Sequence, residues 1–128
     1  MLAKNKNQTK VAVMFVNNEI ILESLKKAVE KLGYEVRQDM DSCLDARFAI
    51  IGAYFAYLGI IKQLRAINPL MPVVVIESSD YKLNGFLGES GNEVYDVIHI
   101  DNNDELEISR KIQDWFSKGQ GKLLVGKD

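Results

Sequence analysis

The run Val11-Ala-Val-Met-Phe-Val16, followed at once by Asn17-Asn18, indicates best how this chain folds. Its six residues are apolar without alternation, which is typical of a strand buried on both faces of a parallel sheet. Two runs of the same kind follow, Phe48-Ala-Ile-Ile51 and Pro72-Val-Val-Val-Ile76. Because such strands need helices on both faces of the sheet, the three runs predict an α/β domain.

Segments with helical spacing of apolar residues separate these strands. The first begins after Asn18, whose side chain is suited to cap a helix, and stops at Gly33. Strands alternating with helices predict a doubly wound, three-layer (βα)5 sandwich with right-handed crossovers. The predicted elements are strands at 10–16, 34–38, 48–52, 72–76 and 96–100, and helical segments at 19–32, 39–46, 58–67, 80–89 and 104–118, the last capped by Asn103.

Length and composition fit one domain. The chain has 128 residues and a formal net charge of -2, and this charge argues against nucleic-acid binding, which needs a basic face. Cys43 is the only cysteine, which excludes an internal disulfide and a zinc site built from cysteines. The polar N-terminus does not resemble a signal peptide, and no apolar run approaches the length of a membrane span. We therefore expect a cytoplasmic protein.

Three segments are expected along the chain. Residues 1–9 are predicted to be a disordered N-terminal segment, and residues 10–118 form the domain. Residues 119–128 contain an apolar Leu-Leu-Val run after a break flanked by glycines. Two interpretations of this tail remain open: it packs back on the domain, or it is a linker to an output domain that lies outside this sequence.

The strand ends lack the side chains of an active site. In a fold with parallel strands, the active site normally lies at the carboxyl ends of the strands. Asn17 and Asn18 follow the first strand, while Gly52 and Ala53 stand at the end of the third. Phosphoryl transfer to the protein would need carboxylates to hold a metal and one carboxylate to attack. We therefore predict no enzyme activity, no metal and no cofactor.

The order of elements and several local stretches resemble the receiver domains of bacterial two-component response regulators. The resemblance spans Lys10 to Lys118 and implies a flavodoxin-like fold with strand order 2-1-3-4-5. The stretches that carry it are Val11–Asn18, Lys31-Leu-Gly-Tyr-Glu-Val36, Ile60-Ile-Lys-Gln-Leu-Arg65 and Pro72–Ile76.

Every chemical position of that family is altered here. The acidic pair after the first strand is replaced by Asn17 and Asn18, and the phosphoacceptor aspartate by Ala53, or by Gly52 in a register shifted by one. Glu77 stands in place of the Thr or Ser after the fourth strand, with Ser78 and Ser79 next, and Ile100-Asp101 in place of the Lys after the fifth. The resemblance thus implies a degenerate receiver that works without phosphorylation.

Such a domain would act through its surface. In receivers the fourth helix and fifth strand form the output face, so the resemblance implies protein contacts there: a homodimer, or control of an attached output domain. Degenerate receivers also stand at the N-terminus of enhancer-binding transcription activators, which implies a role in signal transduction or transcription regulation. The candidate interface residues are Tyr81, Leu83, Phe86, Leu87, Val94, Tyr95 and Trp115.

Other interpretations of single features remain. Asn17, Asn18, Glu77 and Asp101 are an alternative lining for a polar cleft that senses a nucleotide or another small molecule. The aromatic residues Tyr54, Phe55 and Tyr57 either pack in the core or fill the vacant pocket and meet a partner. His99, the only histidine, is interpreted as a strand residue whose ring is satisfied locally. Gly88-Glu-Ser-Gly91 lacks the Lys of a phosphate-binding loop.

Overall fold

The computed structural model describes residues 9–79, 93–101 and 104–126. The predicted helix at 80–89, the expected cap Asn103 and residues 1–8 of the expected disordered segment lie outside the described residues. So do four of the candidate interface residues, namely Tyr81, Leu83, Phe86 and Leu87.

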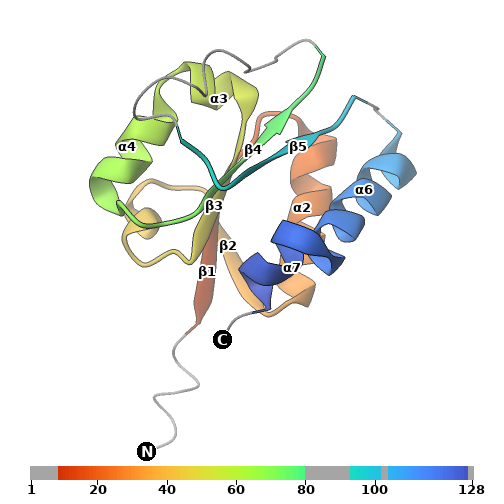
Figure 1. The fold of residues 1–128 in the computed structure, drawn as a ribbon, viewed down its shortest axis with the longest axis horizontal. Coiled ribbons are helices and arrows are strands. Elements are labelled where there is room, and N and C mark those ends of the chain that lie inside the picture. Colours follow the sequence, from red (N-terminus) through yellow and green to blue (C-terminus); the bar gives the residue numbers. More distant parts are fainter. Residues whose placement is uncertain (1–8, 80–92, 102–103, 127–128) are drawn as a thin grey trace, which may run out of the picture.

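Five parallel strands form one sheet in the order β2-β1-β3-β4-β5 (Figure 1), so the predicted fold class and strand order are confirmed. The register places Val13 beside Ala49 and Glu77 beside His99. Each strand begins and ends at its predicted residue or one residue away from it. They are β1 (Lys10–Phe15), β2 (Tyr34–Arg37), β3 (Phe48–Gly52), β4 (Val73–Glu77) and β5 (Asp96–His99).

Two apolar cores lie on opposite faces of the sheet. Successive residues of β3 alternate between them: Phe48 and Ile50 belong to one core, Ala49 and Ile51 to the other. Each of these side chains is fully buried, which explains why the strands are continuously apolar in sequence. Helices α2 (Glu19–Lys31), α6 (Glu105–Ser117) and α7 (Gly119–Val125) cover the first face. The short 3-10 helix η1 (Asp41–Leu44), α3 (Ala53–Tyr57) and α4 (Ile60–Ile67) cover the second.

The first helix is capped as the sequence predicts. The Asn18 side-chain oxygen accepts a hydrogen bond from the Ile21 amide at 3.0 Å, which satisfies one of the amides that a helix start leaves unpaired. The helix ends before Gly33, whose φ of +94° lies in the left-handed region that favours glycine. This turn brings the chain directly into β2.

The structure corrects two predicted elements. The helix expected at 58–67 begins at Ile60 as α4, after a turn at Gly59, where φ is +86°, and an additional short helix, α3, follows β3 directly. Helix α6 has Asp104 at its cap position, one residue later than the expected cap Asn103.

The tail is not extended after residue 118. Its residues 119–125 form helix α7, in which Leu124 and Val125 pack against the first core. Figure 1 shows α7 lying along α6 and leading the chain back toward the edge of the sheet where β1 begins.

Candidate functional site

The carboxyl ends of β1, β3, β4 and β5 lie along one edge of the sheet, where the sequence analysis placed the candidate pocket (Figure 1). The structure divides this edge into two halves of different chemistry. The half at β1 and β3 carries amides and aromatic rings, whereas the half at β4 and β5 carries two carboxylates and the histidine.

None of the four candidate positions in the half at β1 and β3 carries a carboxylate. Asn18 uses its side-chain oxygen to cap α2, and Asn17 is exposed. Gly52 has no side chain, but a Cβ placed on it would have the Asn17 side-chain oxygen as a neighbour at 3.8 Å. Ala53, only 4% exposed, is the first residue of α3. Asn17 and Gly52 therefore lie side by side, and no side chain at the four positions has the carboxylate of a phosphoacceptor.

Aromatic side chains lie beside this half. The ring of Phe55, on α3, lies 6.2 Å from that of Phe15 at the end of β1. Tyr54 packs edge-on against Phe55 at 5.5 Å, while 42% of Tyr54 and 45% of Tyr57 stay exposed. The cluster thus contributes both to packing beside the strand ends and to the outer surface.

A hydrogen-bonded network joins the ends of β4 and β5. One ring nitrogen of His99, Nδ1, lies 3.2 Å from the Glu77 carboxylate, and the other, Nε2, lies 2.7 Å from the Asp101 carboxylate. Asp101 also accepts hydrogen bonds from the Ser79 amide at 2.6 Å and from its hydroxyl at 2.7 Å. We call these four residues the histidine clamp. Ile100, which was grouped with the pocket, points into the core and is only 2% exposed.

The clamp shifts the acid–base equilibria of its members. The hydrogen bonds from Ser79 and from the His99 ring hold the pKa of Asp101 well below its usual range. Hydrogen bonds to Asp101 and Glu77, aided by their negative charge, raise the pKa of His99. The network therefore favours the ionised form of both Asp101 and His99.

The clamp is not arranged as a catalytic or metal site. The Ser79 hydroxyl donates to Asp101 rather than to His99, so the histidine is not placed to activate it as a nucleophile. The two carboxylates bind opposite ends of one imidazole ring, which prevents all three side chains from sharing one ion. Among the described residues, no group of three His, Cys, Asp or Glu side chains is placed to hold a metal.

The described candidate interface residues are partly occupied by contacts within the domain. Val94 is half-buried and packs against the second core. The Tyr95 hydroxyl donates to the carbonyl of Gln120 at 2.9 Å, and the Trp115 indole donates to Asp96 at 2.7 Å. Tyr95 and Trp115 thus help to hold α7 and α6 against the edge strand β5.

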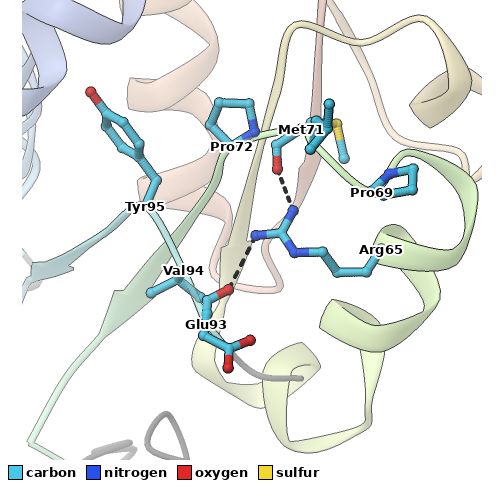
Figure 2. Close-up of a pocket in the computed structure, with 8 residues that line it drawn as sticks. Arg65, Pro69, Met71, Pro72, Glu93, Val94 and Tyr95 are labelled. Carbon is cyan, nitrogen blue, oxygen red and sulfur yellow. Dashed lines mark hydrogen bonds between the residues drawn. The ribbon is translucent and has the colours of Figure 1, made fainter. Parts of the chain in front are cut away.

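Of three hollows among the described residues, only the one that flanks β5 and α6 is lined by a clamp residue, His99. The one in Figure 2, of about 330 Å³, lies where the chain enters β4 and β5. There the Arg65 guanidinium reaches between two loops and donates to the carbonyls of Met71 and Glu93. The second, of about 370 Å³, is lined by Tyr34, Arg47, Pro72, Tyr95, Leu123 and Leu124. A third flanks β5 and α6. Asn17, Asn18, Glu77 and Asp101, the residues proposed for a sensing cleft, line none of these three.

Sequence reasoning missed the clamp and the helical form of α7, although one of its two interpretations of the tail was packing against the domain. Glu77 and His99 are 22 residues apart, and only the parallel register of β4 and β5 brings them opposite each other. The usable signal was that each stands at the end of a predicted neighbouring strand. No helix among the described residues is long and apolar enough to span a membrane.

Solved structures with this fold include receiver domains. The chain is similar to a CheY-like protein, TadZ, of Pseudomonas aeruginosa, with 16% identity over 94% of this chain and 96% of that one and a TM-score of 0.56. It is also similar to a putative response regulator of Chloroflexus aurantiacus, with 12% identity, coverage of 93% and 99%, and a TM-score of 0.56. A de novo designed Rossmann 2x3 protein matches with 18% identity, coverage of 87% and 91%, and a TM-score of 0.53.

These likenesses establish the fold, which is the CheY-like, flavodoxin-like fold of receiver domains. No protein-family model matches the sequence, and no curated protein matches it. A designed protein shares the architecture, so function has to be argued from the side chains of this chain rather than from its fold.

Proposed function

We propose that the chain is a receiver-like regulatory domain that works without aspartyl phosphorylation, through contacts with other protein surfaces. It is not an enzyme. Its role is in signal transduction or transcription regulation in the cytoplasm, as a homodimer or as the control element of an attached output domain. The slight negative charge of the chain supports a role in which this domain does not itself grip nucleic acid.

The end of β3 carries the main support for this proposal. A receiver presents its phosphoacceptor there, whereas Gly52 and Ala53 have no oxygen on their side chains. Neighbouring groups do not replace what is missing, because Asn17 is neutral and Asn18 is engaged in capping α2. Of the acids in the β4–β5 half of this edge, Glu77 and Asp101 are bound to the His99 ring. The proposal follows from this joint loss of nucleophile and metal ligands.

Exposed apolar side chains at the same edge support a role in protein contact. Ile20 follows β1, Tyr54 follows β3 and Leu106 follows β5, with exposed fractions of 41%, 42% and 76%. Apolar and aromatic side chains of this kind are common at the centres of protein interfaces. The edge that holds chemistry in a working receiver here offers apolar surface instead.

Sedimentation velocity of the purified chain tests both parts of the proposal. We expect a homodimer whose dissociation constant is the same with and without acetyl phosphate and Mg²⁺. Burial of one Leu side chain is worth about 1.5–3 kcal/mol. Because both protomers of a homodimer carry the change, two such side chains are lost, and Leu106→Ser should weaken the dimer by at least roughly a hundredfold.

Leu32→Ser is the matched control. Leu32 is also exposed, but it lies at the C-terminal end of α2, whereas the candidate edge lies at the N-terminal end of that helix. The substitution should leave the dimer unchanged. A chain that stays monomeric at every concentration would contradict the homodimer, and a dimer that forms only after treatment with acetyl phosphate would contradict independence from phosphorylation.

A further inference from the structure

The histidine clamp joins the carboxyl ends of two neighbouring strands, β4 and β5. Glu77 is the last residue of β4, and His99, its neighbour in the register, is the last residue of β5. Asp101 and Ser79 lie in the segments that leave these strands. The ring of His99 therefore sits between a carboxylate from the β4 side and another from the β5 side.

The two contacts of the ring define its protonation state. Ionised carboxylates only accept hydrogen bonds, and a neutral imidazole has one donor and one acceptor nitrogen. Both His99 nitrogens face a carboxylate oxygen, at 3.2 Å and 2.7 Å. Both contacts can be hydrogen bonds only when the ring carries two protons, so the geometry is that of an imidazolium held between two anions.

We propose that His99 is a proton-operated clamp, which in its imidazolium form ties the carboxyl end of β4 to the segment after β5. Loss of one proton leaves a single N–H. Nε2, which makes the shorter contact to Asp101, keeps its proton. Nδ1 then presents a lone pair to the Glu77 carboxylate, and the two repel each other. Asp101 stays anchored by the amide and hydroxyl of Ser79. The end of β4 is thus the part that deprotonation releases.

The charges around the ring favour the protonated clamp. The Lys111 ammonium donates to the backbone carbonyl of His99 at 3.2 Å and opposes the ring's charge, but the two carboxylates in direct contact with the ring outweigh it. Their hydrogen bonds raise the pKa of His99, as the geometry requires. Among the described residues, the charged groups that face His99 or line the hollow beside it are Glu77 from β4, Asp96 from β5, Asp101 after β5, and Lys111, Asp114 and Lys118 from α6 and its end.

This inference goes beyond the proposed function. It concerns the β4–β5 half of the edge and gives the domain a response to pH, whether or not the domain dimerises. A histidine is suited to such a response, because it is the side chain whose ordinary pKa lies closest to physiological pH.

NMR titration of the whole chain tests the clamp cleanly, because His99 is the only histidine and gives a single ring signal. We expect its midpoint to lie above about pH 6.5, the ordinary value of an imidazole. The Ile100 amide, which donates to the Glu77 carbonyl at 2.9 Å, should shift with the same midpoint, because it reports on the end of β4. A midpoint at or below about pH 6.5 would overturn the clamp. So would an Ile100 amide whose chemical shift does not change as His99 titrates.

Variants separate the two carboxylates. Glu77→Gln and Asp101→Asn should each lower the midpoint, Asp101→Asn more strongly because its contact is the shorter. Asp114→Asn is the matched control, because Asp114 lies near the ring but pairs with Lys118 at 3.1 Å, and it should lower the midpoint less than either. His99→Gln should abolish the pH-dependent shift of the Ile100 amide. Equal effects of Asp114→Asn and Glu77→Gln would overturn the proposal, and the wild-type titration decides it even where a variant does not fold.

Discussion

Replacing Gly121 by alanine probes the docking of α7. Gly121 is buried against α6, and a Cβ there would lie 1.9 Å from the Trp115 carbonyl oxygen and 2.7 Å from ring atom Cε3 of the same residue. Real Cβ atoms essentially never come closer than 3.0 Å to such atoms. Helix α7 must therefore move away from α6 by about 1 Å, since the nearest obstacle is backbone rather than a flexible side chain.

The size of the effect follows from what this movement disturbs. Overpacking of this kind costs about 1–3 kcal/mol. The displacement also strains the hydrogen bond from Tyr95 to the carbonyl of Gln120 and the packing of Leu124 and Val125 on the core. Alanine in a helix regains about 0.5–1 kcal/mol relative to glycine. We therefore expect Gly121→Ala to lower the free energy of unfolding by about 1–2 kcal/mol.

Urea unfolding followed by tryptophan fluorescence measures both the loss of stability and its location, because Trp115 is the only tryptophan. The emission of the folded variant should change, since its Trp115 no longer meets α7 in the same way. Gly52→Ala is the control: a Cβ there has its nearest neighbours at 3.8 Å, so it should be close to neutral. A Gly121→Ala chain with wild-type stability and emission would refute the docking of α7 on Trp115.

Three further predictions concern the strand ends. Asn18→Ala should lower the free energy of unfolding by about 1 kcal/mol in chemical denaturation, because the Ile21 amide loses its cap. The control Asn17→Ala, at the exposed neighbouring residue, should lower it by much less. Equal effects of the two substitutions would argue against the cap. In stability measurements against pH, the contribution of His99 should be fully present below about pH 6.5 and lost as the pH rises through its raised pKa, because the folded protein binds this proton more tightly. The stability contributed by Asp101, whose pKa is lowered, should be present above about pH 3.9 and lost as the pH falls. If His99→Gln left the dependence of stability on pH unchanged, the contribution assigned to His99 would be wrong.

The fold was predictable because its signals are local. Continuous apolar runs such as Phe48–Ile51 mark strands buried on both faces, and Asn18 and Gly33 mark the ends of the first helix. Helix α3 escaped prediction because five residues, Ala53–Tyr57, are too few to show a helical period. Helix α7 escaped because Gly119 and Gly121 lower helix propensity, and its stability comes from contact with α6 instead.

The site was predictable only in what it lacks. The missing nucleophile at Gly52 and Ala53 is a matter of residue type, which the sequence shows directly. The histidine clamp depends on the register of β4 against β5, which brings Glu77 opposite His99, while Asp101 reaches the same ring from two residues further along the chain. Contacts of this kind follow from tertiary geometry, so local patterns do not reveal them.

The most direct test of the central claim is the intact mass of the chain after incubation with acetyl phosphate and Mg²⁺, beside a working receiver treated in the same way. We predict no added phosphoryl group on this chain, because the positions at Gly52 and Ala53 offer no nucleophile. A stable acyl phosphate on any aspartate, observed under conditions that label the working receiver, would contradict a domain that acts without phosphorylation.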